Sequence, residues 1–448
     1  ILNFGLSLSA TASDFNHDGW VDIYVSNDFD SPDYLYINNQ DGTFNEVAKT
    51  SLKHTAQYGM GADIADYNND QLLDIAQVDM TPEDNRRSKA NMSSMNPLGF
   101  EKMVKAGLNH QYMQNCLQLS RGVDESGNPI FSEVSRLSGI ATTDWSWSIL
   151  FADLDNDGWK DITISNGTRR DINNRDYFNT LKTRNHFGGV NLSAEEIQNI
   201  PSEKISNYVF RNRGDLTFEN VVEKWGWEEK TFSNGAAYTD LDNDGDLDFV
   251  INNIDQEASV YENNNIQNNN YLSVTLNGPK HNKNGLGAKT YVTVSESSQY
   301  SEMTLTRGFQ SSVPPKMHFG LGKSKIVDEI RVIWPDGSTS KMSNISGNQN
   351  LIVDFQDAQQ KQQPISSKKK IFKTISPSSL GIDFKHNENK YDDYIYEPLL
   401  PYETSKLGSG VAVADVNGDG LDDMYLGGAS YQPGILYIQT DNGNFQKS

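Results

Sequence analysis

The sequence predicts an all-β fold: blades of a β-propeller, then a small β domain, then the start of a second propeller. Three observations predict it. One acidic pattern recurs along the chain, short runs of β-branched and aromatic residues flank its copies, and glycine (35 residues) and tyrosine (20 residues) are abundant. A recurring strand–turn unit with a spacing close to one four-stranded blade is typical of propellers, and the composition suits strands joined by many turns.

The repeat is the pattern Asp-x-(Asp/Asn)-x-Asp-x-x-x-Asp, in which glycine usually follows the third acidic position. The first two of its five copies are separated by about the length of one blade. The wider separations later in the chain require insertions or another domain. The copies, named loops one to five, contain Asp14, Asn16, Asp18 and Asp22; Asp66, Asn68, Asp70 and Asp74; Asp153, Asp155, Asp157 and Asp161; Asp240, Asp242, Asp244 and Asp248; and Asp415, Asn417, Asp419 and Asp423.

Short strands flank these loops, because apolar runs bounded by turn residues occur on both sides. A third strand and a turn with Asn/Asp-Gly chemistry follow several copies, which is typical of a hairpin. Each unit is therefore strand, acidic loop, strand and hairpin, the content of one blade. The predicted strands are 61–65, 148–152 and 410–414 before loops, 23–25, 162–164 and 249–251 after loops, and 34–37, 208–210 and 436–438 in hairpins.

Two segments interrupt the blades. Residues 81–115 include the run 99–106, which predicts a short helix. Residues 167–205 include Ser193 followed by Glu196, a capping box that predicts the start of another helix. Insertions of this kind fall on one face of a repeat protein and often form its binding surface.

The repeat also divides the chain into domains. We expect propeller blades in residues 1–270, with helical insertions near 81–115 and 167–205. Residues 271–355 lack the acidic pattern but keep β-rich runs, which predicts a separate small β domain. Residues 356–375 are polar and low in complexity, so we expect a linker. Residues 376–448 contain loop five and are expected to form the first blade of a second, truncated propeller.

The acidic loops have the donor set that calcium prefers, because Ca²⁺ takes six to eight oxygen ligands in a flexible cage. Side-chain oxygens at positions 1, 3 and 5 would face the inside of a tight turn, and glycine at position 6 would permit the bend. The acid at position 9 would close the cage. We therefore expect up to five Ca²⁺ sites, in which position 7 lends a backbone carbonyl from Trp20, Leu72, Trp159, Asp246 and Leu421.

Two other interpretations of the loops are less favourable. An EF-hand closes with glutamate at position 12, but here that position is mostly apolar and falls in the following strand. A metal-free Asp/Asn turn would explain a single copy, whereas an acid at position 9 of every copy favours calcium. Without cations the clustered carboxylates would repel one another, so metal removal is expected to lower thermal stability. Loop two has Gln71 in place of glycine and is expected to be the weakest or least regular site.

The charge balance limits the partners. The chain has 38 Lys+Arg against 60 Asp+Glu, a formal net charge of −22, which repels nucleic acid and anionic membranes. No apolar run approaches the roughly 18 residues that a membrane span needs.

The single cysteine, Cys116, cannot form an internal disulfide and is expected to be a small buried hydrophobe. Both ends fall within the repeat pattern, so we expect an export signal, and with it a lipid anchor, to belong to a missing N-terminus.

Motifs for other activities are incomplete, absent or explained by the repeat. The tripeptide 213–215 matches the Arg-Gly-Asp that integrins bind, but it occupies a hairpin turn of the repeat. Residues 320–324 end like a phosphate loop but lack its first glycine. The sequence has no Gly-x-Ser-x-Gly elbow and no His-Glu-x-x-His motif, and its seven histidines are scattered. Four tryptophans could stack on sugars or pack in blade cores: Trp145, Trp147, Trp225 and Trp227.

Several segments resemble one known family. The loops resemble the FG-GAP/VCBS repeat of integrin-α-type propellers. Residues 143–147 (Thr-Asp-Trp-Ser-Trp), 232–238 before loop four, and the small-domain motifs at 284–288, 318–322 and 334–337 resemble bacterial relatives of the cartilage acidic protein family that carry an ASPIC/UnbV domain. The resemblance covers nearly the whole chain, although a complete propeller ring is not visible on either side of the ASPIC/UnbV-like segment. It implies an exported, calcium-binding protein, often attached to the cell surface, without a settled activity.

These observations predict an extracellular scaffold at the outer cell surface. Calcium would stiffen the blades, and the inserted loops would bind a protein or a glycan. The alternative is an enzyme that acts on extracellular polysaccharide with acids from residues 81–115 or 167–205, because paired carboxylates can hydrolyse a glycosidic bond. The sequence identifies no catalytic residue and favours no nucleic-acid partner.

Overall fold

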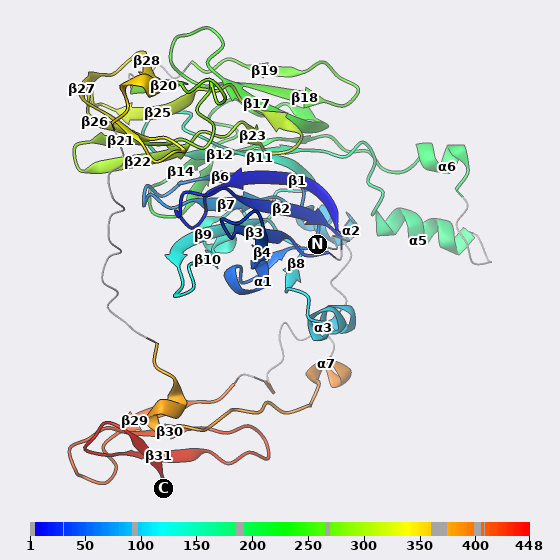
Figure 1. Ribbon diagram of the computed structural model, residues 1–448. Coiled ribbons are helices and arrows are strands. Elements are labelled where there is room, and N and C mark those ends of the chain that lie inside the picture. Colours follow the sequence, from blue (N-terminus) through cyan, green and yellow to red (C-terminus); the bar gives the residue numbers. More distant parts are fainter. Residues whose placement is uncertain are drawn as a thin grey trace. The chain divides into compact units, whose positions relative to one another are not determined.

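Strands dominate the protein (Figure 1). Two compact units, Ile1–Gln363 and Pro364–Ser448, divide the chain. Among the described residues, no helix is long and apolar enough to cross a membrane. The computed structural model describes residues 5–29, 31–91, 97–184, 192–264, 269–359, 374–397, 405–406 and 408–448.

The first blade is an antiparallel sheet whose four strands pair in chain order. Loop one joins its first two strands, and a hairpin joins its last two. The short helix α1 (Ala48–Ser51) leads away from it. Its strands are β1 (Leu6–Ser13), β2 (Asp22–Asp28), β3 (Tyr34–Asn38) and β4 (Phe44–Glu46).

The second and third blades repeat this order with helices inserted between strands. The second contains β6 (Ala62–Ala65), β7 (Asp74–Gln77), β9 (Cys116–Val123) and β10 (Pro129–Glu133). The third contains β11 (Ser146–Ala152), β12 (Asp161–Asn166), β14 (Tyr208–Asn212) and β15 (Phe218–Asn220). Two-stranded pairs accompany them: β5 (Thr55–Ala56) with β8 (Gln111–Tyr112), and β13 (Ile205–Ser206) with β16 (Lys230–Thr231).

The fourth blade has three strands, β17 (Ser233–Thr239), β18 (Asp248–Asn253) and β19 (Ser259–Tyr261). The innermost strands of the four blades, β1, β6, β11 and β17, are neighbours in that order. The blades therefore stack side by side through their inner strands, as in a propeller.

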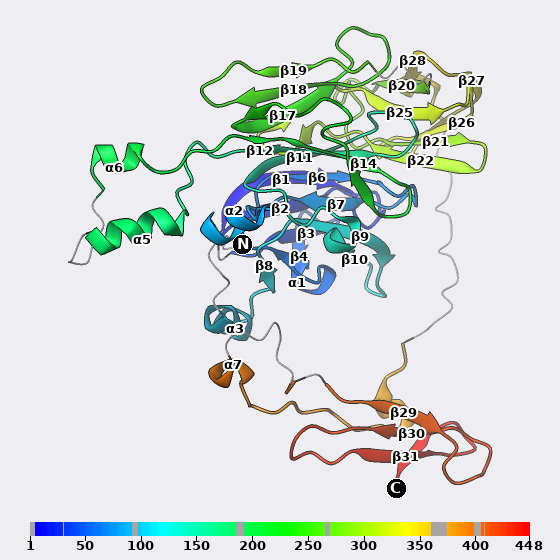
Figure 2. The same cartoon turned by 180° about the vertical axis from the view of Figure 1, so that it is seen from behind.

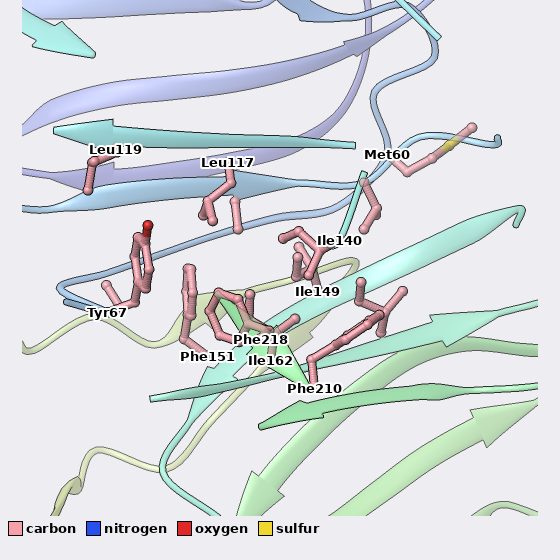
Figure 3. Close-up of a cluster of buried hydrophobic side chains, with 14 of the residues drawn as sticks. Met60, Tyr67, Leu117, Leu119, Ile140, Ile149, Phe151, Ile162, Phe210 and Phe218 are labelled. Atoms are coloured by element: carbon pink, nitrogen blue, oxygen red, sulfur yellow. The ribbon is translucent and has the colours of Figure 1, made fainter. Parts of the chain in front are cut away.

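The largest core lies between the second and third blades (Figure 3). Leu117 on β9 faces Ile149 and Phe151 on β11, and all three are buried. The ring of Tyr67, at position 2 of loop two, stacks on Phe151 with 6.0 Å between centroids. Phe218 at the start of β15 packs against the same tyrosine. Phe218, from the hairpin of the third blade, therefore packs against loop two of the second blade.

The helices fall within the two predicted insertions or beside short turns. Helices α5 and α6 lie beyond the blades (Figure 2). The capping box is formed, because the Glu196 amide donates to Ser193 Oγ while the Ser193 amide donates to Glu196. The helices are α2 (Asn85–Asn91), α3 (Pro97–Lys105), α4 (Ser135–Ser138), α5 (Arg175–Arg184) and α6 (Ala194–Gln198).

The small β domain consists of two sheets around its own core. In the first sheet β20 pairs antiparallel with β25 and parallel with β28. The core contains the fully buried Trp334 and Phe319. The strands are β20 (Asn270–Asn277), β21 (Lys289–Val294), β22 (Ser297–Glu302), β25 (Met317–Gly322), β26 (Ile326–Ile333), β27 (Thr339–Ser346) and β28 (Gln349–Asp354), followed by the 3₁₀ turn η1 (Phe355–Asp357).

A small hairpin of this domain, β23 (Thr306–Arg307) with β24 (Ser311–Ser312), reaches the inner strands of the blades. Its Gly308 amide donates to the Ala62 carbonyl on β6 (3.0 Å), and its carbonyl accepts from Ser9 on β1 (3.0 Å). Gly308 has φ +59°, and a Cβ there would meet Ser148 Oγ at 2.2 Å. A glycine is therefore required where the hairpin fits between blades.

The second unit contains one four-stranded sheet in chain order. Loop five joins its first two strands. Its elements are η2 (Pro377–Leu380), α7 (Asp393–Tyr396), β29 (Val411–Ala414), β30 (Asp423–Leu426), β31 (Ile435–Gln439) and β32 (Phe445–Lys447).

The predicted secondary structure is confirmed at the level of elements. All five loops join two antiparallel strands and none joins helices, so rejection of an EF-hand is confirmed. The helix predicted at 99–106 is α3. Cys116 is buried at the start of β9, as expected. The linker predicted at 356–375 lies mostly outside the described residues.

Candidate metal centres

Loops one, two, three and five are tight turns folded around the first aspartate of each loop. In loop one, Asp14 Oδ1 accepts from the Asp18 amide (3.0 Å) and Oδ2 accepts from the Gly19 amide (2.7 Å). Asp18 Oδ1 in turn accepts from the Trp20 amide (2.8 Å). These hydrogen bonds pull the carboxylates at positions 1 and 5 toward the inside of the turn, as Asp and Asn side chains commonly do in turns.

The aspartate at position 9 ties the loop to the blade. Asp22 Oδ2 accepts from the amide of Phe15 at position 2 (3.0 Å), and its Oδ1 accepts from the Asn38 amide at the end of β3 (2.8 Å). All five loops repeat this pair of contacts. Position 9 was predicted only as the closing ligand, and the structure adds a second role as the link between loop and hairpin.

In loops one, two, three and five, the first aspartate accepts from the amides at positions 5 and 6. The expected irregularity of loop two is wrong, because the Gln71 amide donates to Asp66 Oδ2 (3.0 Å) as glycine does elsewhere. Gln71 adopts φ 71° to do so, close to the 95° of Gly158. Its metal affinity stays a prediction. Loop four differs most, since the described contacts of Asp240 do not include these amide bonds.

Loops three and four bring their carboxylates closest together. One ligand oxygen from each of Asp153, Asp155 and Asp161 lies within 4.8 Å of the others. The same holds for Asp240, Asp242 and Asp248. The residues at position 7 donate their amides to the position 5 carboxylate in every loop; they are Trp20, Leu72, Trp159, Asp246 and Leu421.

Burial raises the pKa of many of these carboxyl groups. The pKa of Asp153 and that of Asp161 are well above the usual value, chiefly because burial removes water and secondly because neighbouring carboxylates repel. Burial likewise raises the pKa of Asp157 to about 6, of Asp66 to about 6 and of Asp22 to about 7. Burial therefore disfavours the ionised forms of these carboxyl groups, and a bound cation would stabilise those forms.

Among the described residues, basic side chains outside the loops form ion pairs with carboxylates of three loops, and sequence reasoning missed them. Arg211 on β14 contacts Asp155 Oδ2 through Nε (2.6 Å) and Asp157 Oδ2 through a terminal nitrogen (2.7 Å). Lys289 of the small β domain pairs with Asp14, and Lys316 Nζ lies 3.8 Å from Asp240 Oδ2. Strand alternation does not single out Arg211, because the side chain of the next residue, Asn212, also contacts loop three through the Lys160 carbonyl (2.9 Å).

The small β domain also contacts loops one, three and four. Glu302 on β22 accepts from the Asp14 amide (3.3 Å), and His318 Nε2 lies 2.6 Å from Asn156 Oδ1 in loop three. A side chain at Gly245 in loop four would collide with the Tyr271 ring. No local pattern in the sequence signals these contacts, because they join segments far apart in the chain.

The donors present fit a calcium ion. They are carboxylate and amide oxygens, which a hard cation prefers. Asp155 Oδ1 and Asp240 Oδ1 are buried and accept no hydrogen bond from any residue in the described ranges. A buried carboxylate oxygen without a donor is costly unless a cation binds it.

The other motifs have structural roles. Residues 213–215 form the turn between β14 and β15, where Asp215 accepts from the Thr217 amide (3.0 Å); this agrees with a repeat turn. Residues 320–324 begin within β25 instead of a strand-to-helix loop. Trp227 is buried against Phe249 and Tyr261. Trp145, Trp147 and Trp225 are partly buried beside blade cores.

Comparison with known proteins gives the same two regions. The model of the FG-GAP-like repeat matches residues 14–76, which include loops one and two. The model of ASPIC and UnbV matches residues 278–361 in the small β domain.

Curated relatives extend the similarity along the chain. Cartilage acidic protein 1 of Homo sapiens is 23% identical over 79% of this chain and 43% of its own length. The proteins of the same name from Mus musculus (22%) and Xenopus tropicalis (24%) match 79% and 75% of this chain, and 44% and 42% of their own lengths. The chain thus spans less than half the length of these relatives. It contains FG-GAP-like repeat and ASPIC/UnbV regions and is homologous to cartilage acidic protein 1.

Proposed function

We propose that this chain is part of an extracellular, calcium-binding β-propeller scaffold that binds a protein or a glycan at the cell surface. The observation that carries the proposal is the repeated oxygen cage, in which buried carboxylate oxygens of loops three and four have no hydrogen-bond donor in the described part of the chain. Homology to cartilage acidic protein 1 supports an extracellular scaffold.

In this proposal the residues at positions 1, 3, 5 and 9 of each loop hold Ca²⁺, with a carbonyl from position 7. The ion supplies positive charge that neutralises the clustered carboxylates and links the two strands that the loop joins. The link extends to the hairpin, because Asp161 at position 9 also accepts from the Asn212 amide (2.9 Å). Calcium would therefore rigidify a whole blade.

Thermal unfolding with and without calcium tests this step. The proposal predicts a markedly higher melting temperature in calcium than in chelator, because an ion that binds only the folded protein stabilises it by mass action. Magnesium at the same concentration is the control, since it tolerates flexible cages poorly. Coincident melting curves in calcium and chelator would refute the calcium sites.

The ligand-binding part of the proposal has a candidate site in the fourth blade. A cavity of about 840 Å³ is lined by the partly buried Trp225, by Tyr261 and Val260 of β19, and by Asp155 and Glu262. Aromatic faces beside carboxylates are suited to stack on a sugar ring and bind its hydroxyl groups. This composition favours a glycan as ligand. The alternative, an enzyme acting on extracellular polysaccharide with acids from residues 81–115 or 167–205, stays a prediction.

A glycan array tests binding, with Trp225→Ala as the variant and Trp145→Ala, on the third blade, as the matched control. We expect calcium-dependent binding that Trp225→Ala abolishes and Trp145→Ala keeps. Release of shorter sugars from a polysaccharide panel would instead support the enzyme. If no glycan binds in calcium, a protein ligand becomes the remaining form of the proposal.

Location outside the cell is also part of the proposal. The acidic charge balance and the homology support it. Protease treatment of intact source cells should digest the full-length protein if it is surface-exposed, and detergent extraction would separate a lipid-anchored form from a released one. Protection of the protein until the cells are lysed would contradict an extracellular location.

A further inference from the structure

A second group of metal-ligating side chains lies in the second blade, away from the acidic loops. His54 follows α1, Cys116 begins β9, and Glu133 ends β10. One ligand atom from each, an imidazole nitrogen, the thiol sulfur and a carboxylate oxygen, lies within 4.8 Å of the others. Because three separate segments supply these groups, no single turn accounts for their convergence.

The register of the sheet explains why the groups meet. Glu133 on β10 lies opposite Gln118 on β9, and Cys116 is two residues before Gln118, so all three side chains are on one face of the sheet. His54 is held over this face, because Gln118 Nε2 donates to its carbonyl (2.7 Å). The imidazole also packs perpendicular to the Tyr112 ring, with 4.8 Å between centroids.

The hydrogen bonds around His54 leave lone pairs facing one another. Arg136 Nε donates to Gln114 Oε1 (2.8 Å), which turns Gln114 Nε2 toward His54 Nε2 at 3.2 Å. The ring nitrogen must then accept, since the amide nitrogen can only donate. Glu133 Oε2 lies 3.5 Å from the same ring nitrogen. Its other oxygen already accepts from the Leu117 and Ser135 amides.

A further oxygen in this region has no donor. Gln118 is buried, and its Oε1 accepts no hydrogen bond from any residue within the described ranges. Its amide adjoins His54 through the bond to the His54 carbonyl. Buried polar atoms are almost always satisfied. The imidazole nitrogen, the Glu133 oxygen and the Gln118 oxygen thus all offer lone pairs in one buried region.

We propose that His54, Cys116 and Glu133 bind a zinc-class transition-metal ion, with Gln118 Oε1 or a water in the fourth position. Nitrogen, thiolate sulfur and carboxylate oxygen are the ligands of tetrahedral zinc sites, whereas calcium takes oxygen alone. A divalent ion cancels the two negative charges of the thiolate and the carboxylate, which a buried site requires. Solvent reaches the site through His54, whose side chain is 17% exposed.

Binding changes two groups in the site. The Cys116 thiol gives its proton to solvent as the metal–sulfur bond forms. Gln114 Nε2 gives up its bond to the His54 ring nitrogen and donates to Ser135 Oγ, which is already 3.4 Å away. The three ligand atoms already lie within 4.8 Å of one another, so small side-chain shifts bring them onto one ion.

Cobalt(II) titration of the full chain in excess calcium tests the proposal. Cys116 is the single cysteine, so a thiolate-to-cobalt charge-transfer band can come only from this site, and calcium keeps cobalt from the acidic loops. We expect the band to saturate at one equivalent of cobalt and to disappear when zinc(II) is added. A folded protein that takes up no cobalt, or takes it up without the thiolate band, would overturn the proposal.

Three variants sharpen the test. Cys116→Ala should lose the band completely, and His54→Ala should weaken cobalt binding at least about tenfold, since even outer-shell partners have effects of that size. His110→Ala removes an exposed imidazole outside the triad and should bind cobalt as the wild type does. Calcium-dependent melting checks that each variant folds. If Cys116→Ala does not fold, the wild-type titration decides, and an undiminished affinity in folded His54→Ala contradicts the site.

Discussion

Loops three and five have the same motif and the same turn but opposite surroundings. The Asp157 amide donates to Asp153 Oδ1 (3.1 Å), and the Asp419 amide donates to Asp415 Oδ1 (3.2 Å). Asp153 is buried, and its pKa is raised by that burial. Asp415 is exposed, and hydrogen bonds from the backbone, first of all from the Gly420 amide, lower its pKa.

The difference shows which properties of a loop are local. The turn comes from contacts between residues at most five apart, so the motif is sufficient to form it. The electrostatics come from what covers the loop. Above Asp153 lies Gly320 of the small β domain, where a Cβ would meet Asp153 Oδ2 at 2.1 Å. Loop five belongs to the second unit, whose described residues form one sheet. Its Asp415 is exposed.

The largest effect should separate Asp153→Ala from Asp415→Ala. In calcium, Asp153→Ala should lower the free energy of unfolding by roughly 2 kcal/mol or more, because buried amide donors lose their acceptor and the site loses a ligand. Asp415→Ala should leave the main unfolding transition nearly unchanged. Chemical denaturation measures both free energies, and hydrogen exchange should show faster local exchange at each mutated loop. Equal effects on the main transition would remove the distinction between the loops.

The second-largest effect should be on the pH dependence of stability, which should differ between the metal-free first unit on one side and loop five and the calcium-loaded protein on the other. In chelator, acidification from about pH 7.5 to pH 5 should stabilise the metal-free first unit. Its carboxyl groups have raised folded pKa values, about 7 for Asp22 and about 6 for Asp66 and Asp157. Each such group contributes stability that is complete below its unfolded pKa and is lost as the pH rises through the folded value.

Loop five and the calcium-loaded protein should show the opposite trend. The lowered pKa of Asp415 contributes stability that is lost as the pH falls through the folded value. In saturating calcium, acidification should also destabilise the first unit, because protons compete with the ion for carboxylates. Melting temperatures at several pH values, with and without calcium, measure these slopes. If the melting temperature changed with pH in the same direction in chelator and in calcium, the raised pKa values of the buried loop carboxyl groups would be contradicted.

A smaller effect is expected from Arg211, which binds Asp155 and Asp157. Arg211→Ala should raise the calcium affinity of loop three a few-fold, because it removes a competing positive charge from a partly exposed position. Arg213→Ala, in the next turn and paired with Glu219 at 3.9 Å, is the matched control and should not change the affinity. Calcium titration by calorimetry gives both values. A weaker affinity in Arg211→Ala would mean that this arginine positions the ligands.

The smallest effect should come from Gln71→Gly in loop two. Gln71 has φ 71°, a conformation that costs a side chain roughly 1–2 kcal/mol, part of which glycine loses again through its entropy. The variant should gain up to about 1 kcal/mol of stability in denaturant unfolding. Gly158→Ala, with φ 95°, is the reciprocal change in loop three and should destabilise. A loss of stability in Gln71→Gly would show that the glutamine side chain makes a stabilising contact.

The sequence was sufficient for the features that depend on near neighbours. Strand periodicity and the acidic pattern predicted a strand beside every loop, and the Ser193 capping box predicted the start of α6. The carboxylates that meet in loop three, Asp153, Asp155 and Asp161, were all among the predicted ligands.

Contacts between distant segments could not be predicted. Lys289 and Asp14 are far apart in the chain, and nothing in either motif indicates the other. The hairpin around Gly308, which touches the inner strands of the blades, has no repeat signature. The convergence of His54, Cys116 and Glu133 depends on a sheet register that only the fold determines.

Crystals of the chain grown in calcium would test the central claim most directly, through anomalous scattering at the acidic loops. The account predicts an anomalous peak among Asp153, Asp155 and Asp161, another among Asp240, Asp242 and Asp248, and comparable peaks in the remaining loops. Loops that contained only water in saturating calcium, with their carboxylates turned outward, would contradict it.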